Sequence, residues 1–100
     1  MSHTFEIRQA AEVEFDDAAN WYRSIDRIFR DRFVHAVNQC ISKITERPFS
    51  FPVVERTRVR RAIIDGFPFA VFFILDDTHI IVLSIFHTSR NPIIWRGRID

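Results

Sequence analysis

Two long apolar runs, separated by a short polar turn, dominate the hydrophobic pattern of the chain. The first covers residues 67–75 (FPFAVFFIL), the second covers residues 79–87 (HIIVLSIFH), and residues 76–78 (DDT) lie between them. Phe, Val and Ile are enriched in strands, whereas Asp and Thr favour turns. Pro68 and the β-branched content argue against a buried helix, so the pattern predicts a β-hairpin.

The first apolar run lacks a polar face. Phe69, Val71 and Phe73 alternate with Ala70 and Phe72, as expected of a central strand that is covered on both sides. In a chain of 100 residues we expect enough helix to cover one face of the sheet. The other face then requires a terminal segment, a second subunit or a partner, and an uncovered apolar face would mark an interaction site.

Helical periodicity precedes the hairpin. Apolar residues recur at steps of three and four over residues 9–24 and again over residues 27–46. The first stripe holds Ala11, Phe15, Ala18, Tyr22 and Ile25, and the second holds Phe29, Phe33, Val37, Cys40 or Ile41, and Ile44. Asp26 can cap the second helix, and Pro48 ends it. The pattern predicts an α-hairpin, and we expect Trp21, beside the first stripe, to belong to the core.

Two shorter segments complete the predicted sheet. Residues 4–8 alternate between polar and apolar, and residues 57–65 (TRVRRAIID) alternate with Val59, Arg61 and Ile63 on one face. We interpret residues 49–55 as an irregular connection and the residues after His87 as a tail. The predicted fold is α+β with the order β-α-α-β-β-β. It is one domain over residues 1–100, an antiparallel sheet with the N-terminal helical hairpin packed on one face.

Composition narrows the class of protein. Hydrophobic residues make up 47% of the chain, enough for a modest globular core. The single cysteine, Cys40, cannot form an internal disulfide and falls on the helical stripe, so we expect it to be buried and inert. We identify no secretory signal, and the apolar runs are too short to span a bilayer as helices. We therefore expect a cytoplasmic protein that does not enter the membrane.

The basic residues are unevenly distributed. Thirteen of the 14 basic residues are arginines, although the formal net charge is only +1. Arginine offers a planar donor fork that suits carboxylates and phosphates alike. We predict a partner-binding surface from two clusters, one over residues 56–61 and one in the tail. Its members are Arg56, Arg58, Arg60, Arg61, Arg90, Trp95, Arg96 and Arg98.

An ordered set of short motifs resembles a known family. The motifs are WY (21–22), RF (32–33), PFSFP (48–52), VRR (59–61), GFPFAVFF (66–73) and H-x-x-R-x-P-x-x-W (87–95). Their order and spacing are similar to the RelE/ParE superfamily of bacterial toxins from type II toxin–antitoxin modules, closest to ParE-like plasmid-stabilisation proteins. The resemblance implies a compact β-α-α-β-β-β toxin that is neutralised by a cognate antitoxin encoded beside it.

The resemblance leaves the target of the toxin open. ParE-like members of the superfamily poison DNA gyrase by binding, whereas RelE-like members bind the ribosome and cut mRNA. We favour gyrase as the partner, with the ribosome and mRNA as the alternative. A third reading is a non-toxic or decayed module that retains only its antitoxin. A homodimer and a toxin–antitoxin hetero-oligomer both remain open.

The candidate catalytic residues apply only to the nuclease reading. Metal-free RNA cleavage needs a base for the 2′-hydroxyl, a donor for the leaving oxygen and positive charge on the phosphate. His87, Arg90, Arg60 and Arg61 are the candidates. RelE-like nucleases typically carry a richer basic set, and this chain has no tyrosine after Tyr22. The alternative for His87 is an imidazole that fixes the tail by hydrogen bonds. The four histidines show no metal-ligand spacing, and we expect no metal and no cofactor.

Overall fold

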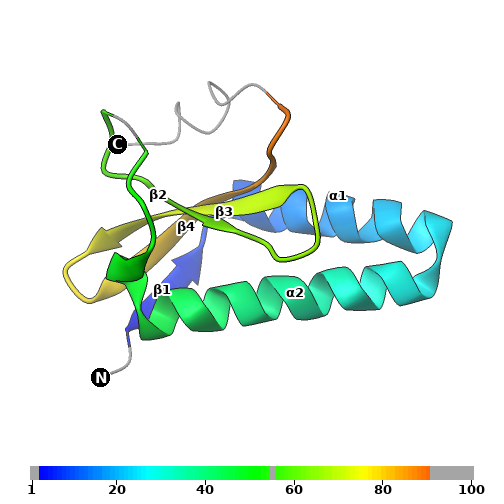
Figure 1. The fold of residues 1–100 in the computed structure, drawn as a ribbon, viewed down its shortest axis with the longest axis horizontal. Helices are drawn as coiled ribbons and strands as arrows, with labels where there is room; N and C mark the ends of the chain where they lie inside the picture. Colours follow the sequence, from blue (N-terminus) through cyan, green and yellow to red (C-terminus); the bar gives the residue numbers. More distant parts are fainter. Residues whose placement is uncertain (1–2, 55, 91–100) are drawn as a thin grey trace.

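The computed structural model describes residues 3–54 and 56–90 and has the predicted order of elements (Figure 1). The elements are β1 (Thr4–Ile7), α1 (Gln9–Ile25), α2 (Arg27–Glu46), the short 3₁₀ helix η1 (Pro48–Ser50), β2 (Arg60–Ile63), β3 (Phe69–Asp76) and β4 (His79–His87). The β-α-α-β-β-β order and the α-hairpin are therefore confirmed. Asp26 caps α2 as predicted, because its side chain accepts a hydrogen bond of 2.9 Å from the Ile28 N–H.

The β3–β4 hairpin forms the centre of the sheet, as the apolar runs predicted. The strand order is β1-β4-β3-β2, so both hairpin strands have a neighbour on each side. Asp76 pairs with His79 across the turn, and Asp77 adopts a left-handed φ of 56°. Aspartate tolerates that conformation better than most residues, which explains why an acidic turn can close the hairpin without glycine.

The sheet is mixed, which corrects the antiparallel prediction for one strand. β1 pairs in parallel with β4, from Thr4 opposite His79 to Ile7 opposite Val82. The other two pairings, β2–β3 and β3–β4, are antiparallel. A short turn forces antiparallel pairing, but β1 and β4 are separated by most of the chain. The intervening helices provide the long connection that a parallel pair requires.

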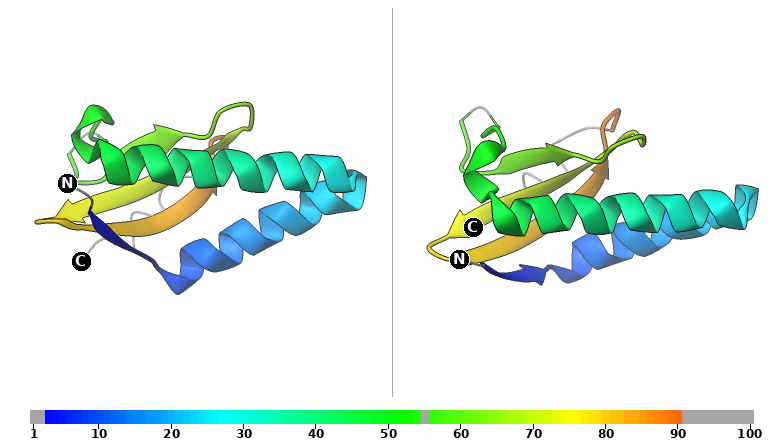
Figure 2. Two further views of the ribbon diagram at one scale, coloured as in Figure 1. Left: turned by 90° about the horizontal axis from the view of Figure 1, so that it is seen from below. Right: turned by 60° about the horizontal axis from the view of Figure 1, so that its bottom comes forward.

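Both helices cover one face of the sheet (Figure 2). The buried side chains on that face come from α1, α2 and the three strands β2, β3 and β4, with Ala11, Phe33, Ile44, Phe73 and Ile85 among them. The Phe33 ring lies within 5.9 Å, centroid to centroid, of the rings of Phe15, Tyr22, Phe67 and Phe69. This aromatic cluster joins the two helices to the first half of β3.

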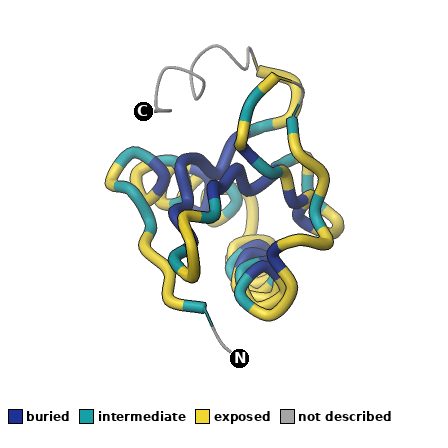
Figure 3. The backbone as a smooth tube through the Cα atoms, turned by 90° about the vertical axis from the view of Figure 1, so that its left-hand side faces the viewer, coloured by how far each residue is buried: buried dark blue, intermediate teal, exposed yellow. Residues whose placement is uncertain are grey.

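The opposite face of the sheet is also buried, so it does not require the second subunit or the partner that were two of the three expected ways to cover it. A second cluster contains Val59, Ala70, Phe72, Ile74, Ile81, Leu83 and Phe86, with Val54 packed against it. Figure 3 shows the buried part of the chain concentrated in the sheet. An antitoxin is therefore not required to cover a surplus apolar face of this sheet.

The helical hairpin extends beyond the sheet, and this corrects the expected position of several residues. The end of α1 and the start of α2 project past the strands in both figures that show the ribbon (Figures 1 and 2). Trp21 and Ile25, both expected in the core, are 60% and 54% exposed. Helical periodicity identifies the inward side of a helix, but it does not show how far the sheet beneath it extends. Among the described helices, none combines the length and apolar character needed to cross a bilayer.

We predict that Phe33→Ala lowers the free energy of unfolding by about 3–5 kcal/mol, because it leaves a cavity where both helices meet the sheet. Urea denaturation followed by circular dichroism measures the change. Phe49→Ala is the matched control, since Phe49 is 71% exposed, and we expect it to cost less than about 1 kcal/mol. Equal losses in the two variants would show that the aromatic cluster does not hold the hairpin to the sheet.

Candidate functional site

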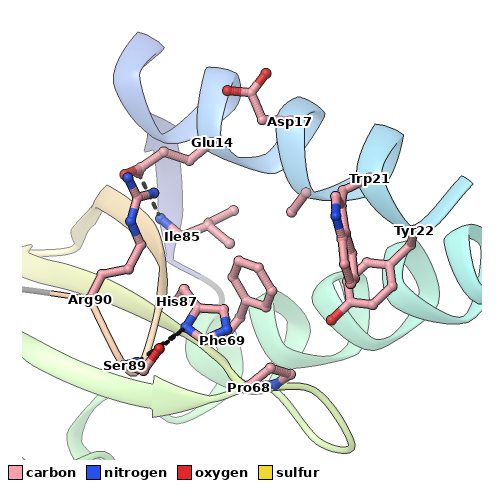
Figure 4. A pocket seen from close by; sticks show the side chains of 11 residues that line it. Glu14, Asp17, Trp21, Tyr22, Pro68, Phe69, Ile85, His87, Ser89 and Arg90 are labelled. Atoms are coloured by element: carbon pink, nitrogen blue, oxygen red, sulfur yellow. Dashed lines mark hydrogen bonds between the residues drawn. The ribbon is translucent and has the colours of Figure 1, made fainter. Parts of the chain in front are cut away.

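A cavity of about 520 Å³ lies between α1 and the adjoining ends of β3 and β4 (Figure 4). Its volume falls within the range of about 300–1,000 Å³ that is typical of ligand sites. Trp21, Tyr22 and Phe69 form an aromatic wall. The remaining lining comes from Glu14, Asp17, Ala18, Pro68, Ile85, His87, Ser89 and Arg90. The cavity thus brings together two of the four candidate catalytic residues, His87 and Arg90.

His87 is held by the turn that follows β4. Its Nδ1 atom accepts a hydrogen bond of 3.2 Å from the Ser89 N–H, and the Ser89 hydroxyl oxygen lies 2.7 Å from the same atom. Its ring packs edge to face on Phe69, with centroids 5.1 Å apart. The turn therefore engages Nδ1 and holds the ring against Phe69.

Arg90 follows one turn later and lies at the same mouth of the cavity. Its backbone N–H donates to the His87 carbonyl at 3.1 Å, and its guanidinium carbon lies 5.6 Å from the centre of the Phe86 ring. Figure 4 shows the guanidinium at the end of the cavity where the Glu14 side chain also lies. Arg90 therefore contributes positive charge to a site that already contains carboxylates.

Glu14 links α1 to β4 beside this cavity. Its Oε1 atom accepts a hydrogen bond of 2.8 Å from the Ser84 hydroxyl and one of 3.2 Å from the Ile85 N–H. Ser84 is the only polar side chain classed as buried among the described residues. β1 ends opposite Val82, so the next stretch of β4 is paired with β3 on one side only, and on the other side the Glu14 carboxylate satisfies groups that would otherwise be unpaired.

The arginines of β2 lie apart from the cavity and on opposite faces of the sheet. Arg60 donates to the Phe51 carbonyl at 2.7 Å, and its guanidinium lies over the Phe49 ring at 5.3 Å. Arg61, one residue on, points to the other face, as the predicted alternation requires. β3 lies between β2 and β4, which places β2 and β4 about 10 Å apart. Arg60 and Arg61 therefore do not form a pair with His87 and Arg90.

The other predicted partner-binding residues are only partly described. Arg56 and Arg58 are exposed in the segment before β2, and Arg56 has a left-handed φ of 63°. Trp95, Arg96 and Arg98 lie outside the described residues. Residues 3–54 and 56–90 contain no group of three His, Cys, Asp or Glu side chains that could hold a metal ion. The basic surface predicted from all eight residues remains a prediction.

Cys40 is buried between α2 and β2, as predicted from its place on the helical stripe. Its sulfur lies 3.9 Å from the Ala62 carbonyl oxygen. Burial raises the pKa of the Cys40 thiol to about 11, although Lys43 acts in the opposite direction. A thiol with so high a pKa is a poor nucleophile near neutral pH.

The comparison with protein families identifies the chain. A model of the ParE toxins of type II toxin–antitoxin systems, encoded in parDE modules, matches residues 5–92. The chain belongs to this family. The match includes the elements that form the cavity, so the geometry above is that of a ParE-family toxin.

Two solved structures have the same fold as this ParE-family chain. The chromosomal ParDE toxin–antitoxin system from P. aeruginosa aligns with a TM-score of 0.76 and 14% identity, over 88% of this chain and 98% of that one. The RelBE2 toxin–antitoxin complex from Mycobacterium tuberculosis aligns with a TM-score of 0.64 and 14% identity, over 87% and 99% of the two chains. No curated protein sequence matches the chain.

Sequence reasoning did not assign a role to Glu14, and it placed Trp21 in the core. A signal for Glu14 was present, because it lies between Ala11 and Ala18 on the inward stripe of the first helix. A carboxylate at such a position requires a hydrogen-bonding partner when the helix packs. The exposure of Trp21 had no such signal, since it depends on the sheet ending before the helix does.

We predict that Glu14→Ala lowers the free energy of unfolding by about 1–3 kcal/mol, because it leaves the Ser84 hydroxyl and the Ile85 N–H unsatisfied. Glu14→Gln keeps an oxygen acceptor and should lose less. Chemical denaturation measures the free energy of unfolding of both variants. Glu12→Ala, a change at an exposed position of the same helix, is the control, and we expect it to alter that free energy by no more than about 0.5 kcal/mol. A loss that is the same for Ala and Gln would contradict the role of the acceptor oxygen.

We predict that iodoacetamide alkylates Cys40 about a hundred times more slowly in the native protein than in urea at about pH 8. The reason is the rise in the pKa of the Cys40 thiol from 9.0 to about 11. At a pH below both values, this rise lowers the thiolate fraction by about two orders of magnitude. The native rate should increase as the pH rises toward 11. Mass spectrometry follows the reaction, and equal rates in the two states would refute the prediction.

Proposed function

We propose that this ParE-family toxin inhibits growth by binding DNA gyrase and that a cognate antitoxin neutralises it. The observation that carries the proposal is the match of the ParE toxin model to residues 5–92. The resemblance of the motifs to ParE-like members of the superfamily, which act on gyrase by binding, points to the same target. The position of His87 is compatible with this proposal, because the Ser89 N–H donates to its Nδ1 atom at 3.2 Å and so engages that nitrogen within the turn.

The distribution of charge around the cavity supports the same proposal. Glu14 and Asp17 line it together with Arg90, so a phosphate entering the site meets two carboxylates. Carboxylates repel phosphate, and a nuclease of this type depends on concentrated positive charge at the scissile group. Arg60 is bound to the Phe51 carbonyl at a distance from the site and supplies none of that charge.

An antitoxin partner is proposed from the family and from its similar structures. Both solved structures described above are of toxin–antitoxin systems. Family membership implies a module in which toxin and antitoxin are encoded together. Purification of the tagged chain together with the product of the neighbouring reading frame tests this step, and the absence of a complex would count against it.

One observation favours a second function, ribosome-dependent cleavage of mRNA. His87 and Arg90 line the same cavity, which places an imidazole and a guanidinium in one site. In that mechanism His87 would donate the Nε2 proton to the leaving oxygen, and Arg90 would stabilise the charge on the phosphate. This mechanism also requires a separate base for the 2′-hydroxyl, for which the described lining of the cavity offers the carboxylates of Glu14 and Asp17.

We predict that the purified toxin reduces supercoiling of relaxed plasmid by gyrase in a dose-dependent manner. His87→Asn should retain most of this inhibition, because the asparagine oxygen can still accept from Ser89 and no proton transfer is involved. General acid–base catalysis is worth about 10²–10⁴-fold, so a nuclease would lose activity by that factor in the same variant.

A translation reaction with purified ribosomes separates the two functions. Unchanged supercoiling at saturating toxin would reject gyrase as the target. New mRNA ends in the ribosomal A site that disappear with His87→Asn would establish the nuclease instead. Expression without growth inhibition in a host that carries both targets would indicate a decayed module.

A further inference from the structure

The cavity between α1 and the ends of β3 and β4 has one wall of three aromatic rings. Tyr22 packs edge to face against Trp21, with centroids 5.0 Å apart, and against Phe69, with centroids 6.3 Å apart. The rings are inclined to one another and all three line the cavity, so part of their π-surface is open to a ligand. The face of an aromatic ring carries partial negative charge and attracts cations.

The charged side chains that line the cavity do not balance one another. Glu14 and Asp17 supply two carboxylates and Arg90 supplies one guanidinium, so one negative charge is left over when His87 is counted as neutral. Figure 4 shows Glu14 and Arg90 together at the end of the cavity away from Trp21. The surplus negative charge and the aromatic wall therefore favour the same kind of ligand, a monovalent cation.

Two polar groups of α1 at this cavity have no partner within residues 3–54 and 56–90. The Asp17 carboxylate takes part in no ion pair or hydrogen bond there, whereas the neighbouring Glu14 accepts from Ser84. The Tyr22 hydroxyl also has no hydrogen-bond partner in that part of the chain. Burial raises the pKa of Tyr22, so the phenol is neutral near neutral pH. An ammonium group can donate to a carboxylate and to a phenolic oxygen alike.

We propose that this cavity binds a small organic cation, an ammonium group carried on an apolar body such as an aromatic ring. The ammonium group lies against the aromatic wall on the side of Asp17, and the apolar body packs on Phe69, Pro68 and Ile85. The volume of about 520 Å³ accommodates a molecule of this kind as a whole. Such a site does not depend on the target of the toxin, because none of its features involves gyrase or mRNA.

Ligands of other charge are poorer occupants of the cavity. An anion would gain the guanidinium of Arg90 but would meet the carboxylates of Glu14 and Asp17. A neutral apolar molecule would cover the Asp17 carboxylate without compensating its charge, which is unfavourable. The described ranges contain no cluster of His, Cys, Asp and Glu side chains able to hold a metal ion.

Three ligands that share one ring and differ in charge test the proposal: benzylammonium, benzyl alcohol and benzoate. Amide NMR spectra of the isotope-labelled toxin follow each titration. We expect benzylammonium to bind with a dissociation constant in the millimolar range, about tenfold more tightly than benzyl alcohol, with benzoate the weakest. The indole N–H signal of Trp21, identified with Trp21→Leu, should shift. Equal affinity of the cation and the alcohol, or no binding of the cation up to about 50 mM, would overturn the proposal.

Asp17→Asn removes the charge and keeps the shape of the side chain. We expect it to weaken benzylammonium binding about fivefold and to leave benzyl alcohol within about twofold. Asp16→Asn is the matched control, because Asp16 is exposed on the same helix outside the cavity and the change alters the net charge equally. The same loss in both variants would assign the effect to the net charge of the protein and refute the site. Circular dichroism melting confirms that both variants fold.

A lysine residue blocked at both ends separates a free ligand from the side chain of a protein. It carries an ammonium group but no ring, so we expect it to bind at least about tenfold more weakly than benzylammonium. Tighter binding of the blocked lysine would assign the cavity to a protein side chain and overturn the small-molecule ligand. Gyrase inhibition is measured separately, so failure of this site and failure of the proposed target are distinguishable.

Discussion

The packing of Phe33 against its aromatic neighbours is the interaction on which the rest of this structure depends. Phe33 comes from α2, and Phe15 and Tyr22 come from α1. Phe69 begins β3, and Phe67 lies in the turn just before it. One buried ring therefore holds both helices and the central hairpin at once. Large aromatic side chains bury about 150–250 Å² each, so a chain of 100 residues can build its core around a few of them.

The same cluster sets the position of the candidate site. Phe69 contacts Tyr22 on one side and His87 on the other, at centroid distances of 6.3 and 5.1 Å. The aromatic wall of the cavity is thus the outer edge of the core and not an independent feature. Glu14 fixes the other boundary by bonding to Ser84 and Ile85 where β1 ends. The cavity is consequently a gap between two fixed contacts of α1 with the sheet.

The central hairpin and the helices were predictable because their signals are local. Periodicity, the acidic turn and the capping residue Asp26 each depend on neighbours in sequence, and the structure agrees with all three. The alternation of Arg60 and Arg61 was equally local, and it implied that the two guanidinium groups diverge. Treating them as one catalytic pair conflicted with that pattern, and the structure separates them across the sheet.

The features that could not be predicted depend on contacts between distant segments. The parallel pairing of β1 with β4 joins residues more than 70 positions apart, such as Thr4 and His79. The exposure of Trp21 depends on where the sheet ends beneath α1, and that boundary is set by the length of β3 and β4. Neither the pairing of β1 nor the extent of the sheet is determined by residues that are close in sequence to Thr4 or Trp21. Periodicity alone therefore placed Trp21 in the core.

Large apolar side chains remain exposed on the helical hairpin of the molecule. The central strands β3 and β4 are buried on both faces, and the β2 arginine nearest the helices is already bound to a carbonyl group. The helical hairpin, in contrast, exposes Trp21, Ile25 and Ile28 to solvent. Exposed apolar side chains gain free energy only when another surface covers them. A surface that covered the described part of the helical hairpin would therefore gain more apolar contact than one that covered the two central strands.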